Sequence, residues 1–408
     1  MSEVIVIGGG AAGMTAAIFA SEHSRVILIE KNEKLGRKLA ITGKGRCNVT
    51  NNCDIDEVMK NIPRNPRFLY SAMSNFPPSE VMEFFESLGV KLKTERGKRV
   101  FPVSDKAADI VNALERELKR RKVEIVRENV RSLIVENGKC TGVNTNKRQI
   151  RADAVVLATG GKSYPKTGSD GFGYEIARNV GHTIIPPKPS LSALVTEEKW
   201  VRKACGLTLK NCAIKLFNGE KPIYEDFGEL AFTADGVGGA TILSASAHIP
   251  DGAEENCSVL IDLKPALSEE QLDRRILRDF AEIHGGVFAD CLRKLLPKEL
   301  IEPLSDILGV ELSKKISEIT KEERKKLVKT LKSLGLKISG FRHVDEAVIT
   351  RGGVCIKEIS PKTMESKLVE NLFFAGEIID VDAYTGGFNL QIAFATGRLA
   401  GENLQKII

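Results

Sequence analysis

The pattern of apolar and small residues at the start of the chain predicts a strand, a tight turn and a helix. Residues 4–7 are all β-branched, residues 12–20 are rich in alanine, and a second apolar run follows at residues 26–29. β-branched residues favour strands, and strands that alternate with helical segments indicate a parallel sheet. We therefore expect the chain to begin with a β-α-β unit.

The next part of the chain predicts helices and a β excursion. Residues 79–88 and 105–121 have amphipathic helical patterns, and Ser104 is a plausible N-cap for the second helix. Residues 93–103 and 123–126 favour strands. These segments extend the α/β pattern beyond the first unit.

A β-meander follows. Residues 130–135 and 140–144 flank Asn137-Gly138, which is a strong hairpin signal. Residues 153–161 then predict a buried strand, with an apolar run at 154–158 that ends in Thr159, Gly160 and Gly161, whose small side chains let the backbone approach a ligand closely. A meander inside such a sheet is unusual for a plain NAD dehydrogenase and is typical of flavoproteins with two dinucleotide sites.

The middle of the chain predicts an inserted domain. The prolines at 186, 187 and 189 form a stiff break. Beyond them, residues 191–195, 208–217, 229–233 and 257–263 favour strands of an antiparallel or barrel-like unit. From Ser268, where Ser-Glu-Glu-Gln predicts a capping box, the pattern is helical to about residue 334.

The last part of the chain returns to the first pattern, with a strand at residues 371–377 and a helix across residues 385–401. We therefore predict a discontinuous dinucleotide-binding domain at 1–189 and 346–408. An inserted substrate or interaction domain would occupy 190–345, with a helical subdomain at about 267–335. The fold class is doubly wound α/β of the Rossmann type, with an inserted β-barrel-like domain and a helical subdomain.

The first turn carries the candidate binding chemistry. Gly8, Gly10 and Gly13 form a Gly-x-Gly-x-x-Gly fingerprint, and Glu30 follows Gly8 by 22 positions at the end of the second strand. The glycines allow a tight turn and the approach of a pyrophosphate to a helix N-terminus. The carboxylate can accept hydrogen bonds from the ribose hydroxyl groups. This motif predicts an ADP-containing dinucleotide, and by itself it does not separate NAD from FAD.

The segment at 31–51 is rich in glycine, hydroxyl and amide side chains, with Arg37, Lys38, Lys44 and Arg46 among them. Because backbone N–H groups and cations bind phosphates, we interpret it as a loop that wraps an anionic cofactor.

Charge and cysteine content bear on nucleic-acid, metal and membrane partners. A net charge of +6 is small beside 60 basic and 54 acidic residues, so it does not argue for nucleic acid. The eight cysteines lack metal-ligand spacing, which predicts no metal site and a reducing, cytoplasmic location. Neither a signal peptide nor a membrane-spanning apolar run is evident, so we expect no membrane partner.

Several stretches of the chain resemble the HI0933-like flavoproteins, or BaiN type, whose members include aminoacetone oxidase-like proteins and bile-acid reductases. The resemblance covers nearly the whole chain. The most specific stretches are 43–51, 99–106, 158–168, 362–367, 374–382 and 385–391. It implies a glutathione-reductase-like domain with tightly bound FAD. NAD(P)H as a transient cosubstrate stays open, because it could reduce the flavin by direct stacking without a second dinucleotide motif.

The resemblance also implies which residues contact FAD. The ADP half would contact Gly8, Gly10, Ala11, Ala12, Gly13, Glu30, Lys31 and Val130. The pyrophosphate and flavin side would contact Arg37, Lys38, Gly45, Arg46, Cys47, Asn48, Thr159, Gly160, Gly161, Gly376, Glu377 and Asp380. The pyrimidine edge of the flavin would contact Gly387, Phe388, Asn389 and Leu390, where a helix N-terminus stabilises the charge of reduced flavin.

Some positions depart from the family pattern. Members often carry Phe-Thr-His and a Ser-Gly-Pro turn in the inserted domain, where this chain has Ala234, Gly238 and Ala240. Ala383 and Tyr384 follow Asp382, where a glycine is usual. These differences leave FAD binding credible and make a family substrate unsafe to transfer.

The sequence names no catalytic acid or base, and Tyr164 and Tyr384 are candidates because they lie beside flavin-contacting stretches. We predict an FAD-dependent oxidoreductase that moves a hydride between FAD and a small organic substrate or NAD(P)H, as an NAD(P)H-linked reductase or an amine oxidase. An NAD-dependent dehydrogenase, an RNA-modifying flavoprotein and a non-catalytic flavin-binding redox protein stay open. Substrate identity and oligomeric state are not predicted.

Overall fold

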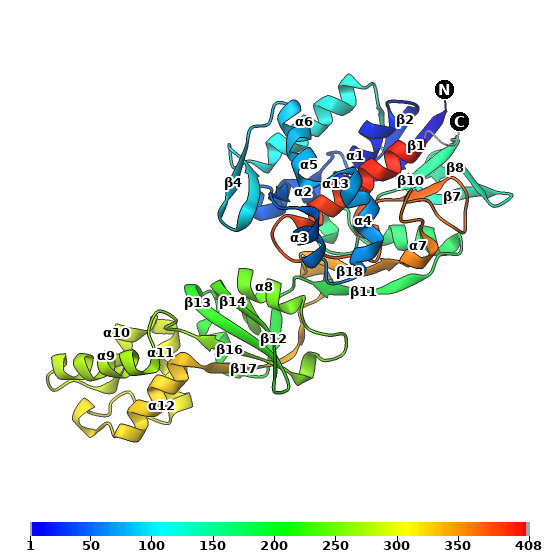
Figure 1. Ribbon diagram of the computed structural model, residues 1–408. Helices are drawn as coiled ribbons and strands as arrows, with labels where there is room; N and C mark the ends of the chain where they lie inside the picture. Colours follow the sequence, from blue (N-terminus) through cyan, green and yellow to red (C-terminus); the bar gives the residue numbers. More distant parts are fainter. Residues whose placement is uncertain (1, 405–408) are drawn as a thin grey trace. The chain divides into compact units, whose positions relative to one another are not determined.

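The computed structural model describes residues 2–404, which form two compact units (Figure 1). One unit runs to Ser190 and resumes at His343, and the other comprises Leu191–Arg342. These limits lie beside the boundaries expected at 189/190 and 345/346. We call them the nucleotide unit and the inserted unit.

The nucleotide unit is built on a five-stranded parallel sheet in the order β19-β10-β1-β2-β6. The strands are β1 (Glu3–Ile7), β2 (Arg25–Ile29), β6 (Glu124–Val126), β10 (Ala154–Leu157) and β19 (Leu372–Phe374). Every residue of β10 is buried, as is every residue of β1 and β2 after the first. A strand buried on both faces needs a continuous apolar run, which is the pattern that the sequence shows.

Two helices in the nucleotide unit pack unusually closely. They are α1 (Ala11–Ala20) and α13 (Phe388–Asn403). A Cβ at Gly397 would lie 2.5 Å from the Ala12 carbonyl oxygen, and one at Gly401 would lie 2.5 Å from that of Ala16. The small residues thus let the last helix lie against the first, and they join the two ends of the chain in one domain.

The other elements of the nucleotide unit form smaller layers around the sheet. The helices are α2 (Arg37–Ile41), α3 (Ile55–Lys60), α4 (Pro66–Asn75), α5 (Pro78–Ser87), α6 (Ala107–Arg120) and α7 (Phe172–Asn179). One three-stranded sheet contains β3 (Thr50–Asn51), β5 (Arg99–Pro102) and β4 (Leu92–Glu95). The predicted meander contains β7 (Val130–Glu136), β8 (Lys139–Thr145) and β9 (Gln149–Arg151).

The structure confirms the hairpin and corrects one helix start. Asn137 and Gly138 both have positive φ, at 51° and 78°, as a two-residue hairpin turn requires. Ser104 does not cap α6, because the N-cap residue is Lys106 and no side chain caps the helix. The Ser104 hydroxyl instead accepts the Lys106 N–H at 3.3 Å, in the turn before the helix.

The proline-rich stretch is a strand, not a break. Residues 186–189 lie within β11 (Ile184–Ser190), which pairs with β18 (Ile349–Val354). The pairing shifts register between Ile185 and Lys188, where the prolines lack N–H donors for a regular ladder. The chain therefore leaves the nucleotide unit on an irregular two-stranded ribbon.

The inserted unit contains a closed barrel, in the order β12-β15-β14-β13-β16-β17. Its strands are β12 (Leu194–Thr196), β13 (Thr208–Asn218), β14 (Lys221–Phe232), β15 (Gly236–Gly238), β16 (Cys257–Asp262) and β17 (Leu334–Phe341). The helices are α8 (Ala240–Ser246), α9 (Glu269–Glu282), α10 (Phe288–Leu295), α11 (Lys298–Leu308) and α12 (Lys321–Lys332).

The predicted capping box at the start of α9 is present. The Ser268 hydroxyl accepts the Gln271 N–H at 3.2 Å, and the Gln271 side chain accepts the Ser268 N–H at 2.9 Å. The structure therefore confirms an α/β Rossmann-type domain with an inserted barrel and helices. Among residues 2–404, no helix is long and apolar enough to cross a membrane.

Candidate cofactor-binding site

The turn after β1 leaves space at one glycine and none at the others. Gly8 has φ +104°, and a Cβ there would lie 2.5 Å from the Ala158 carbonyl oxygen. A Cβ at Gly13 would lie 1.8 Å from the Gly8 oxygen. Gly10 has φ −84°, and a Cβ there would meet nothing within 4 Å. The protein itself therefore needs Gly8 and Gly13, whereas the open side of Gly10 at the start of α1 suits a bound pyrophosphate.

Glu30 lies at the end of β2 and is buried against this turn. Its carboxylate accepts the Gly9 N–H at 2.7 Å, and the Asn32 N–H and side-chain amide at 2.7 and 2.6 Å. Two carboxylate oxygens have about four lone-pair sites, so these three bonds leave room for a ribose hydroxyl. A ribose contact for Glu30 stays a prediction with which these bonds are compatible.

A polar network joins the ends of the parallel strands to the loop at 31–51. The Lys38 ammonium donates to the Ser163 hydroxyl at 2.6 Å and to the Glu377 carboxylate at 2.7 Å. Glu377 also accepts the Ser163 hydroxyl at 3.0 Å and the Thr350 N–H at 2.8 Å. Carboxyl ends of parallel strands meet at one edge of a sheet, and this edge is the usual ligand position in such folds.

Two predicted cofactor residues have a buried polar atom with no hydrogen-bond partner. They are Asn48, at Oδ1, in the loop at 31–51, and Thr159, at Oγ1, directly after β10. Thr159 Oγ1 packs against α7, because a Cβ at Gly173 would lie 1.9 Å from it. Most buried polar atoms are hydrogen-bonded, so Asn48 Oδ1 and the cradle at Gly10 are the features that fit a polar ligand such as FAD.

The loop at 383–389 is rigidly held at the N-terminus of α13. The Asn389 side chain accepts the Ala383 N–H at 2.9 Å and donates to the Ala383 oxygen at 2.7 Å. A Cβ at Gly387, which has φ +103°, would lie 2.4 Å from the backbone of Thr50. The Asn51 side chain donates to the Gly386 oxygen at 3.0 Å. The first N–H groups of α13 thus project from a fixed loop, as the predicted flavin contact needs.

Tyr384, in this loop, is half-buried beside charged groups. Its N–H donates to the Asn61 oxygen at 2.9 Å. Burial and the charge of Asp382 raise the pKa of its phenol, and the charge of Arg351 opposes them. Asp382 is fully buried and accepts the Ser190 hydroxyl at 2.7 Å, with Arg351 Nε at 3.7 Å. Tyr384 therefore keeps its proton at neutral pH, next to a buried ion pair.

Several predicted cofactor residues use their side chains elsewhere. Arg46 pairs with Glu95 and Asp105 and lies over the Phe101 ring at 4.2 Å. Lys31 pairs with Asp170 at 2.7 Å, and Arg37 donates to the Asn32 side chain at 2.6 Å. For these cations a cofactor contact stays a prediction that the side-chain geometry does not support.

Three further candidate residues, Asp380, Cys47 and Tyr164, differ in burial and in their hydrogen-bond partners. Asp380 accepts the side-chain amide of Asn65 at 3.1 Å. Cys47 is fully buried with φ +61°, and burial raises the pKa of its thiol to about 12, so it is not a thiolate nucleophile. Tyr164 has φ +53° and an exposed side chain.

The remaining predicted residues lie in or next to the strand ends and helix starts already described. Gly376 has φ +76°, and its N–H donates to the Thr396 hydroxyl at 2.9 Å. Val130 begins β7, after β6, whose Val126 oxygen accepts the Glu30 N–H at 3.0 Å. The others, by position, are Ala11 and Ala12 in α1, Gly45 before Arg46, Gly160 and Gly161 after β10, and Phe388 and Leu390 in α13.

Sequence reasoning missed Ser163, Thr350, Arg351 and Asp382. The signal for two of them was the pair Gly352-Gly353, because a Cβ at Gly353 would lie 2.4 Å from the Ile378 oxygen. Paired glycines in a β-branched stretch indicate close backbone approach, and this approach brings Thr350 and Arg351 to the end of β19.

Comparisons with known proteins agree with this geometry. The HI0933-like protein Rossmann domain matches residues 2–403. A 3-dehydro-bile acid delta(4,6)-reductase of Clostridium scindens is 33% identical over 406 residues, covering 98% of each chain. A ribosomal RNA dihydrouridine synthase of Haemophilus influenzae is 30% identical over 402 residues, covering 97% of this chain and 96% of the relative.

A solved 3-ketosteroid delta1-dehydrogenase from Sterolibacterium denitrificans shares the fold at 14% identity, with a TM-score of 0.53 and 100% of both chains covered. The match of the family model to residues 2–403 and the open cradle at Gly10 both support a bound dinucleotide. The chain belongs to the HI0933-like family and is an FAD-dependent oxidoreductase.

Proposed function

We propose that this chain uses FAD to reduce a carbon–carbon double bond conjugated to a carbonyl group. The name of the bile-acid relative describes reduction of delta(4,6) double bonds in a 3-oxo compound. The name of the ribosomal RNA relative describes formation of dihydrouridine, in which the 5,6 double bond of uracil is saturated. Both bonds are polarised by a carbonyl, so hydride addition at the far carbon is the shared chemistry.

The observation that carries the proposal is the fixed loop at 383–389 with the N-terminus of α13 behind it. Reduced FAD supplies the hydride when bound, and a helix N-terminus favours its negative charge. α13 has 16 residues, and the Gln391 N–H is the first in it to bond back, to the Gly387 oxygen at 3.0 Å. The N–H groups of Phe388, Asn389 and Leu390 precede that bond and are the proposed contacts.

Saturation of a double bond also needs a proton at the second carbon. Tyr384 is the proposed donor, because the loop holds its backbone and its half-buried phenol is protonated and lies beside the pair of Asp382 and Arg351. Arg351 lies close enough to lower the pKa of this phenol and would stabilise the phenolate that forms. Tyr164 is the weaker candidate, since its side chain is exposed.

The substrate is proposed first as a small enone, because the 33% identical relative acts on a bile acid. A uracil base in RNA is the second candidate, and the 30% identical relative favours it. NAD(P)H is proposed as the electron donor. The sequence has no second Gly-x-Gly-x-x-Gly motif, so the nicotinamide would stack directly on the flavin.

Anaerobic flavin spectroscopy tests the proposal. NADH or NADPH should bleach the flavin, and a 3-oxo-4,6-diene steroid should restore its colour without oxygen. Uridine-containing RNA is the parallel arm, with a gain of two hydrogen atoms on the base as the product signature. Bleaching only by amines, with colour restored only by oxygen, would show an amine oxidase and contradict the proposal.

A further inference from the structure

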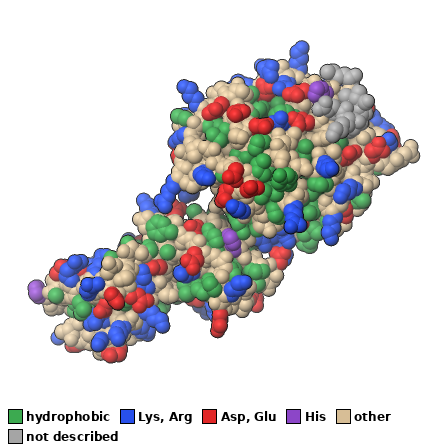
Figure 2. Space-filling view, in the orientation of Figure 1, with side chains coloured by type: hydrophobic (Ala, Val, Ile, Leu, Met, Phe, Trp, Pro, Cys, Tyr) green, Lys and Arg blue, Asp and Glu red, His purple; other side chains and the backbone are tan. Residues whose placement is uncertain are grey.

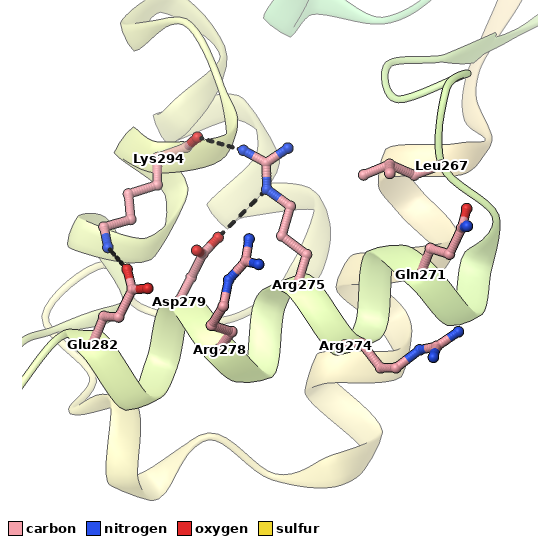
Figure 3. Close-up of a pocket in the computed structure, with 8 residues that line it drawn as sticks. All are labelled: Leu267, Gln271, Arg274, Arg275, Arg278, Asp279, Glu282 and Lys294. Atoms are coloured by element: carbon pink, nitrogen blue, oxygen red, sulfur yellow. Dashed lines mark hydrogen bonds and ion pairs between the residues drawn. The ribbon is translucent and has the colours of Figure 1, made fainter.

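A groove in the inserted unit is lined by basic side chains and lies outside the site described above. It lies beside α9 and α10 and has a volume of about 760 Å³. Its lining residues, drawn in Figure 3, are Leu267, Gln271, Arg274, Arg275, Arg278, Asp279, Glu282 and Lys294. Four of these side chains are cations and two are carboxylates.

Each carboxylate lies within ion-pair distance of one cation, although Asp279 Oδ2 forms no hydrogen bond. Asp279 is buried, and its Oδ2 lies 3.7 Å from Arg275 Nε. Arg275 also donates to the Lys294 backbone oxygen at 3.5 Å, and the Lys294 ammonium lies 2.8 Å from the Glu282 carboxylate. The contacts of Arg275 and Glu282 with Lys294 link α9 to α10 (Figure 3).

Arg274 and Arg278 have no such partners. Both are exposed, and within residues 2–404 no carboxylate lies at ion-pair distance from either guanidinium. Arg274 Nε reaches only the Glu270 backbone oxygen of its own helix, at 3.4 Å. The hydrogen bond from Lys294 lowers the pKa of Glu282, and the charge of Arg278 lowers it further. The groove thus presents two exposed guanidinium groups that form no ion pair within residues 2–404, although Glu282 partly offsets the charge of Arg278.

We propose that this groove binds the phosphate backbone of an RNA, with Arg274 and Arg278 on neighbouring phosphates. The proposal rests on the RNA form of the proposed function. The two arginines are one helical turn apart, about 6 Å along the axis, and a guanidinium pairs with phosphate oxygens through two parallel hydrogen bonds. Figure 2 shows basic and acidic side chains interspersed over the visible face, so a local groove accounts for such binding better than net charge does.

RNA is favoured over an acidic protein by an observation independent of the groove. The relative named as a ribosomal RNA dihydrouridine synthase matches 97% of this chain. An enzyme that reduces one base must also hold the surrounding strand, and phosphate contacts supply that affinity without reading sequence. Arg275 and Lys294, which lie beside Asp279 and Glu282, would hold α9 in place behind the two phosphate-binding arginines.

The test uses the full-length, flavin-loaded protein and a short fluorescent single-stranded RNA of mixed sequence. Fluorescence anisotropy gives the dissociation constant across a salt titration. The Arg274→Gln/Arg278→Gln variant should weaken binding about tenfold or more at about 100 mM salt, and should lower the salt slope by about two. The control, Lys325→Gln/Lys329→Gln, removes the same charge from exposed positions of α12 and should change neither quantity.

Three results would overturn the groove as an RNA site. They are unchanged binding by the arginine variant, an equal loss in the lysine control, and binding of polyglutamate as tight as that of RNA. Re-oxidation of the reduced flavin by an enone, measured on the same preparations, keeps the two proposals apart. If the wild-type protein reduces the enone but binds no RNA, the groove proposal fails alone; if neither enone nor RNA re-oxidises the flavin, the proposed function fails.

Discussion

The nucleotide unit and the inserted unit use buried polar side chains in different ways. In the nucleotide unit, buried polar groups connect segments that are distant in sequence. Thr50 donates to Gln391 at 2.6 Å, and Gln391 donates to the Phe76 backbone oxygen at 2.6 Å. In the inserted unit, the buried hydroxyls of Ser244 and Ser246 donate to backbone oxygens of their own helix segment, at 3.1 and 2.7 Å, and Ser246 also accepts the Ser192 N–H at 2.9 Å.

This difference follows from what each unit must hold. A barrel is stabilised mainly by its closed ladder and apolar interior. Loops that contact a ligand have few apolar contacts of their own. Long-range hydrogen bonds such as Lys38–Glu377 must therefore fix them. Substitutions in the two units should separate cofactor binding from stability.

The largest effect is expected for Gly13→Ala. The added Cβ would lie 1.8 Å from the Gly8 oxygen, so the first turn cannot form, and the variant should lose bound flavin and destabilise the nucleotide unit. Gly340→Ala in β17 is the control, because a Cβ there meets nothing within 4 Å. Flavin absorbance and thermal unfolding are the measurements. A Gly13→Ala protein with normal flavin content would show that the turn is wrongly described.

A core truncation in the inserted unit should give the opposite result. Leu292 in α10 is fully buried, and Leu→Ala in a core costs about 2–5 kcal/mol. Calorimetry of Leu292→Ala should show a lower melting transition for the inserted unit, while flavin content stays at the wild-type value. Loss of flavin in proportion to the lost stability would mean that the two units do not behave independently.

Glu377→Gln should cost less and act on both properties. The amide keeps the shape of the side chain but loses the charge that Lys38 contacts at 2.7 Å. Its NH₂ group would also face Lys38, Ser163 and the Thr350 N–H, which all donate to Glu377. We expect a loss of about 1–3 kcal/mol and faster release of FAD on dilution. Glu225→Gln, which weakens an exposed pair with Lys215 at 3.0 Å in the barrel, should change neither by a measurable amount.

The smallest effect is a pH dependence in the inserted unit. Burial lowers the pKa of His248 from 6.5 to about 4, and its ring stacks on Tyr224 at 4.2 Å. The unfolded state therefore binds a proton that the folded state does not, and stability falls as pH drops from about 6.5 toward 4. Burial also lowers the pKa of His182 in the nucleotide unit. Melting scans between pH 7 and about 5 should show a flatter profile for the inserted-unit transition in His248→Gln, and an unchanged slope there would contradict the assignment.

The sequence predicted the parts of the fold that local chemistry decides. The glycine turn at 8–13, the hairpin at Asn137-Gly138 and the capping box at Ser268 each depend on residues within a few positions of one another. Apolar runs identified the strands of the parallel sheet for the same reason. Residue patterns also predicted the returning helix at 385–401 and the barrel-like inserted unit.

What the sequence did not predict depends on long-range pairing. β11 holds three prolines because its irregular ribbon with β18 tolerates missing donors, and no local pattern reveals that partner. β17 follows helical residues directly and is a strand because β12 and β16 pair with it. In the site, Ser163 and Thr350 meet Glu377 only after folding, and Arg46 is taken up by Glu95 and Asp105 from other segments.

The most direct test of the central claim is the flavin content of Gly10→Ala. The protein's own atoms leave this Cβ free, and φ of −84° suits alanine, so folding should be unaffected. The methyl group would occupy the space assigned to the pyrophosphate. We predict a protein with wild-type circular dichroism and melting temperature that purifies without flavin and does not take up added FAD. Wild-type FAD stoichiometry in this variant would contradict the account, because the dinucleotide could not then pass over Gly10.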